Sequence, residues 1–236
     1  MGKELTTTLE LRHVSKQGIE TYGFSKAYKA SDRVGQEIRF SRDKLTKHLE
    51  EGDCVSGAYM LYHYFEKDLG PFRNLSSLPI ERALGVSEHI RQEGKSFASQ
   101  RPADYMFIRK ELEQTARARF IAKGGHPKNL YPHYMTLEAC DWLKTWYTRP
   151  DWIRIDWDEF QETSMSFTYG DLFPTMRYRE DKPYRRQVYT KREIVEVIAE
   201  YGLPQVWNRH GDQGPERYIE VQIWDDEVLR KYIPND

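Results

Sequence analysis

Two carboxylates in the C-terminal part of the sequence have the residue types that acid–base chemistry needs. Glu220 lies in the alternating segment RYIEVQIW (217–224), on the same side as Tyr218 and Gln222 and opposite the apolar residues. Asp171 follows a glycine in FTYGDLFP, where it either takes part in acid–base chemistry or forms a turn through its carboxylate. A row of aromatic, carboxylate and amide groups suits a nucleobase or sugar ligand, and it equally suits an exposed sheet face.

Three further residues are candidates for the same site. His63 belongs to the aromatic stretch AYMLYHYFE (58–66), Arg73 to the loop beyond it, and Tyr134 to the expected strand HYMTLE (133–138). Loops carried by rigid elements often hold binding residues, although a half-buried strand with a solvated loop explains the first stretch as well. We therefore expect a cleft for a nucleotide-like small molecule, in which Glu220 polarises or activates a hydroxyl and arginines hold phosphates. The residues expected to line it are His63, Arg73, Tyr134, Asp171 and Glu220.

A basic segment suggests a different function. MRYREDKPYRRQVYTKR (176–192) has seven Arg or Lys residues, two acidic residues and three interleaved tyrosines. Arginine pairs with phosphates and aromatic rings stack on bases, so Arg185 and Arg186 are candidate ligand-binding residues. The alternative function is a non-catalytic module that contacts RNA, DNA or a protein partner through this segment. A solvated surface loop is the plainer interpretation, and the net charge of −1 favours it slightly.

A metal site is the weakest of the candidate chemistries. His126, His133 and Cys140 follow each other at intervals of seven, but structural zinc sites usually bring ligands in close pairs, and none occurs here. We expect a helix-ending loop, a strand and a buried apolar thiol instead, with a hydrolase that uses His126 and His133 as the metal-dependent alternative. Phosphate-loop, dinucleotide-binding and nucleophile-elbow motifs are absent from the sequence, and no cofactor is identified.

The elements that must position these residues indicate an α+β fold with a largely antiparallel sheet. Strands are expected at 58–66, 133–138, 151–157, 164–169 and 217–224. Helices are expected from Pro79 to Gly94, from Pro102 to Gly124 and, behind the capping box Thr-Lys-Arg-Glu, from Thr190 to Gly202. A short helix is expected within 138–147, another between Ser41 and Gly52, and an irregular segment at 170–189.

The second of these helices has an apolar stripe that should face the core. The stripe consists of Tyr105, Ile108, Leu112, Ala116 and Phe120. Arg109, Glu113, Arg117 and Lys123 lie mostly off it.

Composition bounds the class of protein. The 236 residues are expected to form one domain, with a less tightly packed part over 1–56. Apolar residues are 39 % of the chain, and sixteen Tyr, ten Phe and six Trp supply much of the area that a core can bury. Two cysteines, no signal-peptide pattern and no long apolar run favour a cytoplasmic protein without a membrane partner.

Three segments resemble known proteins. FIAKGGHPKNLYPHYM, SFTYGDLFP and GPERYIEVQIWDD resemble a group of uncharacterised bacterial proteins over residues 60–230, and that group has no assigned activity to carry over. LYHYF, PHYM and IEVQ more faintly resemble ADP-ribosyltransferase-like folds, in which a His, a Tyr and a late-strand Glu surround a nicotinamide dinucleotide. That resemblance implies these places for His63, Tyr134 and Glu220. The family usually has Gln/Glu-x-Glu, whereas this chain ends the motif in Gln222.

Overall fold

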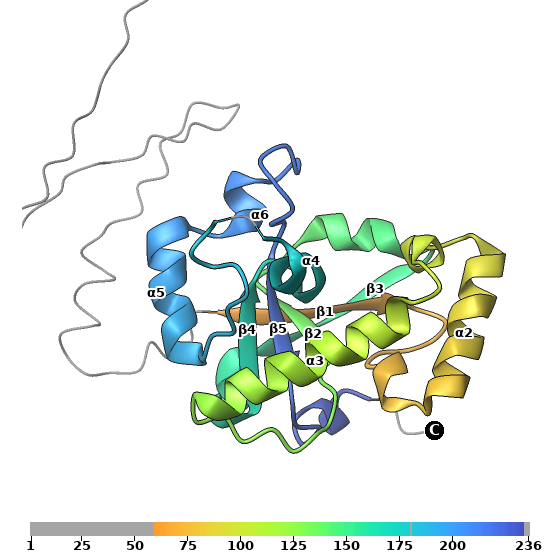
Figure 1. Cartoon of the computed structure of the whole chain (residues 1–236), viewed down its shortest axis with the longest axis horizontal. Helices are drawn as coiled ribbons and strands as arrows, with labels where there is room; N and C mark the ends of the chain where they lie inside the picture. Colours follow the sequence, from red (N-terminus) through yellow and green to blue (C-terminus); the bar gives the residue numbers. More distant parts are fainter. Residues whose placement is uncertain (1–58, 180, 234–236) are drawn as a thin grey trace, which may run out of the picture. The chain divides into compact units, whose positions relative to one another are not determined.

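The computed structural model describes residues 59–179 and 181–233 (Figure 1). Their centre is one five-stranded sheet in the order β3-β1-β2-β5-β4, in which every neighbouring pair is antiparallel. The strands are β1 (Met60–Glu66), β2 (His133–Leu137), β3 (Pro150–Asp156), β4 (Met165–Tyr169) and β5 (Ile219–Ile223). The α+β class, the antiparallel sheet and all five expected strands are confirmed. The helix expected between Ser41 and Gly52 lies outside the described residues.

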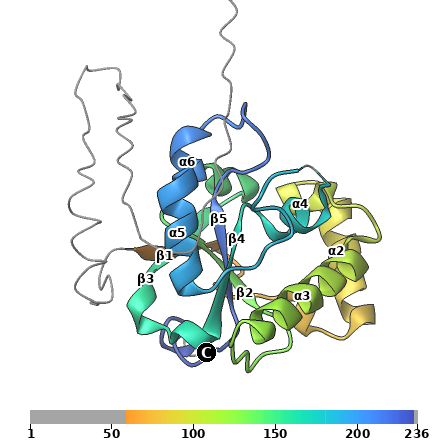
Figure 2. The same cartoon turned by 60° about the vertical axis from the view of Figure 1, so that its left-hand side comes forward.

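Helices pack on both faces of this sheet. They are α2 (Ile80–Glu93), α3 (Tyr105–Ala122), α4 (Leu172–Arg177), α5 (Lys191–Tyr201) and the short α6 (Pro204–Trp207). Figure 2 shows α5 on one side of the sheet and α2 and α3 on the other. In the described part of the chain, no helix is long and apolar enough to cross a membrane.

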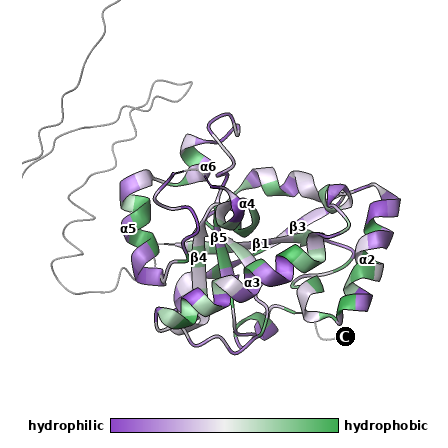
Figure 3. Ribbon diagram, viewed as in Figure 1, coloured by the Kyte–Doolittle hydropathy of each residue, from purple (hydrophilic) through white to green (hydrophobic). Residues whose placement is uncertain are grey.

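One face of the sheet carries the main hydrophobic core. Alternation on β4 and β5 turns Met165, Phe167, Ile219, Val221 and Ile223 to this face, and all of them are buried. The helix α5 covers it with an apolar stripe around the fully buried Ile194, and Figure 3 shows hydrophobic and hydrophilic sides on this helix.

The opposite face is polar, yet it is also buried at its centre. Antiparallel register places Thr136 of β2 and Thr168 of β4 on either side of Glu220, and Tyr134 and Ser166 on either side of Gln222. All five residues of β5 are buried. The sequence left open whether the polar side of β5 faces solvent, and the structure shows that Glu220 and Gln222 on this side are buried.

The expected helix ends are largely found. Thr190 forms both halves of the capping box with Glu193, since its hydroxyl accepts the Glu193 N–H and the Glu193 carboxylate accepts the Thr190 N–H. Gly94 ends α2 with a left-handed φ of 65°. Residues 141–146 form a 3-10 helix rather than an α-helix. The segment expected to be irregular contains α4.

Candidate active site

A cleft of about 1190 Å³ opens on the polar face of the sheet. Its floor comes from β1, β2 and β5, and its walls come from α2, the first half of α3, the 3-10 helix at 141–146 and the start of α4. The five residues that the sequence grouped, His63, Arg73, Tyr134, Asp171 and Glu220, all line this one cleft. Residues separated by up to about two thirds of the chain are thus brought together by the sheet and the loops that it carries.

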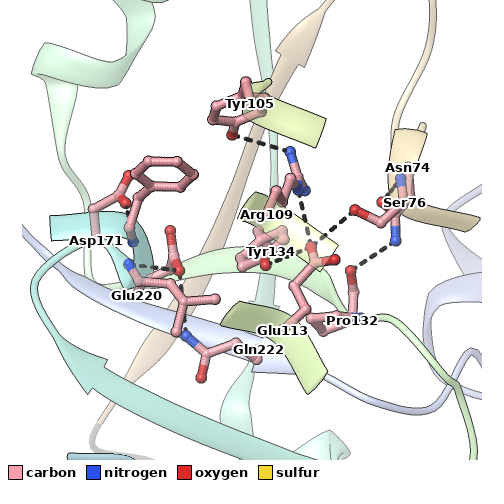
Figure 4. Close-up of polar contacts among 12 residues, drawn as sticks. Asn74, Ser76, Tyr105, Arg109, Glu113, Pro132, Tyr134, Asp171, Glu220 and Gln222 are labelled. Carbon is pink, nitrogen blue, oxygen red and sulfur yellow. Dashed lines mark hydrogen bonds and ion pairs between the residues drawn. The ribbon is translucent and has the colours of Figure 1, made fainter. Parts of the chain in front are cut away.

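Glu220 is the buried acidic group of the floor, with 7 % of its surface exposed. Its Oε1 accepts two N–H donors, the backbone amide of Leu172 at 3.1 Å and the side-chain amide of Gln222 at 3.2 Å (Figure 4). Burial raises the pKa of Glu220 well above its usual value, and the negative charge of Asp171 raises it further. The hydrogen bonds and Arg109 oppose this rise but do not outweigh it.

The hydrogen-bond pattern limits which oxygen of Glu220 could carry a proton. Because Oε1 already accepts two donors, the proton of the neutral acid belongs on Oε2. Oε2 lies 3.4 Å from the hydroxyl of Tyr218, and this hydroxyl donates to Oδ2 of Asp171 at 2.9 Å. A phenol has one proton to donate, and the shorter contact directs it to Asp171; with a proton on Oε2 of Glu220, the Tyr218 oxygen would be its acceptor. The three groups form a short chain from an acid to a carboxylate.

Asp171 owes its position to the turn between β4 and α4. Its Oδ1 accepts the backbone N–H of Phe173 at 2.7 Å and caps the first turn of α4, as the turn interpretation expected. Gly170 before it has a φ of 109°, and a Cβ there would lie 2.9 Å from Oγ1 of Thr175. Since Oδ2 binds Tyr218, Asp171 combines the capping role with a place in the cleft.

A second buried carboxylate lies behind the cleft wall. Glu113 of α3 is fully buried, and its Oε1 accepts hydrogen bonds from the Tyr134 hydroxyl at 2.7 Å, Nε of Arg109 at 2.9 Å and the Ser76 hydroxyl at 3.0 Å (Figure 4). Although both residues lie off the apolar stripe of α3, Glu113 is fully buried and Arg109 keeps only 15 % of its side chain exposed. Burial, followed by the charge of Glu113, raises the pKa of Tyr134 well above its usual value.

His63 is held by backbone groups on both ring nitrogens. Nδ1 lies 2.8 Å from the Tyr134 carbonyl and Nε2 accepts the Phe72 N–H at 2.9 Å, which defines a neutral ring that donates through Nδ1. Burial lowers the pKa of His63 to about 4, against a smaller raising effect of the Tyr134 hydrogen bond. The ring fixes Phe72, whose φ is 57°, and leaves no nitrogen for a substrate.

The arginines named from the sequence occupy three different environments. Arg73 is exposed at the cleft and donates to the Leu69 carbonyl at 2.9 Å. Arg185 is buried and pairs with the fully buried Glu216 at 2.5 Å, so it ties the 176–192 segment to the body of the fold instead of facing a partner. Arg186 is exposed, with a left-handed φ of 55°, away from the residues that line the cleft.

Sequence reasoning missed the polar face of α3. Tyr105, Arg109 and Glu113 follow each other at four-residue intervals, which places them along one side of α3, and Arg101 lies four residues before Tyr105, ahead of the helix. Three of them, Arg101, Tyr105 and Arg109, line the cleft, and Glu113 holds Arg109 from behind. The four-residue spacing of these polar residues is visible in the sequence, and it could have identified the α3 side of the cleft.

No metal centre takes part in this arrangement among the residues described. Within 59–179 and 181–233, no three His, Cys, Asp or Glu side chains are grouped so that they could hold a metal ion. His126 is exposed, and His133 lies 3.4 Å from Asp226. Cys140 is a buried thiol, as expected, and burial raises its pKa.

Comparisons with known proteins leave the site to be interpreted from its own geometry. No protein-family model matches the chain, and no curated protein or solved structure matches it.

Proposed function

We propose that this protein binds a nucleotide-like small molecule in the cleft and acts on it by acid–base chemistry at Glu220. The observation that carries the proposal is the state of Glu220: a buried carboxyl in a cleft, with Oε1 saturated by two N–H donors and Oε2 turned to Tyr218. A carboxylic acid whose pKa is raised by burial is suited to donate a proton to a substrate.

Three groups share the proton transfer. Glu220 donates its proton from Oε2 to a basic atom of the substrate, and becomes a carboxylate. The Tyr218 hydroxyl, which lies between the two carboxyl groups, then turns its hydrogen from Asp171 to the new charge on Glu220. Reprotonation of Glu220 restores the starting arrangement. The sequence suggested that Glu220 polarises or activates a hydroxyl. The geometry supports the role of proton donor for Glu220 instead.

The walls of the cleft support a ligand with a flat ring and an anionic group. The rings of Tyr105 and Phe173 stack with centroids 5.0 Å apart, and Trp146 presents a further aromatic surface. Arg73 and Arg101 lie along the same cleft and supply positive charge. Its volume of about 1190 Å³ leaves room for a ligand of nucleotide size.

The test uses the whole chain and a panel of nucleosides, nucleotides and dinucleotides. Thermal shifts identify the ligand, and NMR of the mixture detects its conversion. We expect Glu220→Gln, which keeps the shape of the neutral acid, to bind the ligand and to lose conversion. Asp171→Asn should lower conversion while it keeps the cap of α4. The proposal fails if no member of the panel stabilises the protein, or if Glu220→Gln converts the ligand as fast as the wild type.

A further inference from the structure

The guanidinium of Arg109 is held in one orientation by buried groups. Its Nε donates to Glu113 at 2.9 Å, and its central carbon lies 4.9 Å from the centre of the Tyr134 ring. Glu113 is itself fixed, because Tyr134 and Ser76 also donate to its Oε1. The Nε side of the guanidinium is thus used inside the protein, and the side chain is fixed before any ligand arrives.

The other edge of the guanidinium faces the cleft. Arg109 lines it and retains 15 % of its side-chain surface, and the single described hydrogen bond at this edge is a long one of 3.5 Å from Nη1 to the Tyr105 hydroxyl (Figure 4). Two parallel N–H groups of a guanidinium match two oxygens of a phosphoryl or carboxylate group. A guanidinium already held through Nε loses little further freedom when it binds such a group.

A second cation converges on the same part of the cleft. The Arg101 guanidinium lies 4.5 Å from the centre of the Tyr105 ring, and the hydroxyl of the same Tyr105 lies 3.5 Å from Nη1 of Arg109. Burial raises the pKa of Tyr147, and the positive charges of both arginines lower it in part, so both charges reach that hydroxyl. Within the described ranges, no carboxylate forms an ion pair with Arg101.

We propose that Arg109 and Arg101 form an oxyanion-binding subsite for a phosphoryl or carboxylate group of the substrate, and that Glu113 is the positioning residue of Arg109. This inference rests on the proposed function, because it places the anionic group of the ligand beside Glu220. It differs from the arginines that the sequence suggested, since Arg73 lies at an exposed position and Arg185 is buried in a structural ion pair.

The subsite has a consequence for the acid. The charge of Arg109 lowers the pKa of Glu220, against the larger effect of burial. An oxyanion on Arg109 offsets that charge and keeps the proton on Glu220. Binding of the anion and protonation of Glu220 therefore favour each other, so that an occupied subsite increases the protonated fraction of Glu220.

The first experiment uses inorganic phosphate and succinate as probes, against chloride at constant ionic strength. Thermal shifts are measured for the wild type, Arg101→Gln, Arg109→Lys and the control Arg119→Gln, a residue of α3 that does not line the cleft. We expect stabilisation of the wild type and the control, and dissociation constants about ten-fold higher in the other two variants. Phosphate alone identifies a phosphoryl subsite, and succinate alone a carboxylate subsite. Equal affinities in all four proteins, or no effect of either probe on the wild type, overturn the subsite.

A second comparison separates positioning from folding. Glu113→Gln keeps an oxygen acceptor for its three donors and removes the charge that holds Arg109. We expect it to weaken AMP binding about ten-fold while adenosine binding stays unchanged, a difference that a general loss of structure would not give. An unchanged AMP-to-adenosine affinity ratio in Glu113→Gln and Arg109→Lys overturns the subsite alone. Failure of both ligands to bind, with phosphate still bound through the arginines, overturns nucleotide binding and leaves the subsite standing.

Discussion

Replacement of Glu220 by glutamine should change how the stability of this protein depends on pH. Glutamine reproduces the neutral acid: its oxygen can keep the hydrogen bonds from Leu172 and Gln222, and its NH₂ group takes the place of the protonated Oε2 beside Tyr218. Near the lower end of the pH range we therefore expect the two proteins to have similar free energies of unfolding.

The magnitude follows from the raised pKa of Glu220. In the unfolded chain a glutamate has its ordinary pKa of about 4.5, whereas burial in the folded wild type lets Glu220 keep its proton to a higher pH. Between these two values the native state binds more protons, so the wild type loses stability as pH rises. Glu220→Gln has no such group, and its stability relative to the wild type should rise by about 1.4 kcal/mol for each pH unit in this window.

Urea unfolding, followed by tryptophan fluorescence at several pH values from about 5 to about 8, measures this difference. Glu196→Gln is the matched control, because Glu196 is an exposed residue of α5 and should give a curve parallel to that of the wild type. If Glu220→Gln also runs parallel to the wild type throughout, Glu220 is ionised in the native state and the reasoning from its burial is refuted.

Three further stability predictions rest on single contacts, each measured by the same unfolding assay. As pH falls from 6.5 to about 4, the free energy of unfolding of the wild type should drop by about 3 kcal/mol, because His63 takes up a proton in the unfolded chain but not in the folded protein. His63→Gln should lack this drop, and an equal drop in both proteins would contradict the prediction. Arg185→Ala should cost about 3–5 kcal/mol, because Glu216 stays buried without this partner, whereas Arg186→Gln should cost less than about 0.5 kcal/mol; equal effects would count against the buried pair. Thr190→Ala should cost about 1 kcal/mol through loss of the cap of α5, and a neutral result would show that the box contributes nothing.

Local patterns in the sequence were sufficient for most of the fold. The alternation in 217–224 identified β5 and the residues that share each of its faces, because side chains on a strand alternate between two faces. The capping box at Thr190 located the start of α5, because its hydrogen bonds involve residues only three positions apart.

The misses depend on contacts that no local pattern records. Glu113 is buried because Arg109, Tyr134 and Ser76 surround it, and two of these come from other elements. The six residues of α4 include a proline and are too few to show a helical period. Arg185 looks like one cation among many in its segment, and only its pairing with Glu216 shows that it belongs inside.

The candidate site was predicted in part for the same reasons. A turn at a strand end indicated Asp171, alternation along a strand indicated Glu220, and a faint family resemblance indicated Tyr134. The antiparallel sheet brings all three to one cleft. Their roles could not be predicted, since the protonation of Glu220 depends on the helices that cover the sheet and on the nearby charge of Asp171.

The central claim is that Glu220 is a neutral acid in a ligand-binding cleft. Its most direct test is a pH titration of the side-chain carboxyl carbons by ¹³C NMR on glutamate-labelled protein, with Glu220→Gln used to assign the signal. We predict that the Glu220 signal keeps the chemical shift of a protonated acid after the exposed glutamates have ionised. A Glu220 signal that titrates together with those of the exposed glutamates would contradict the claim.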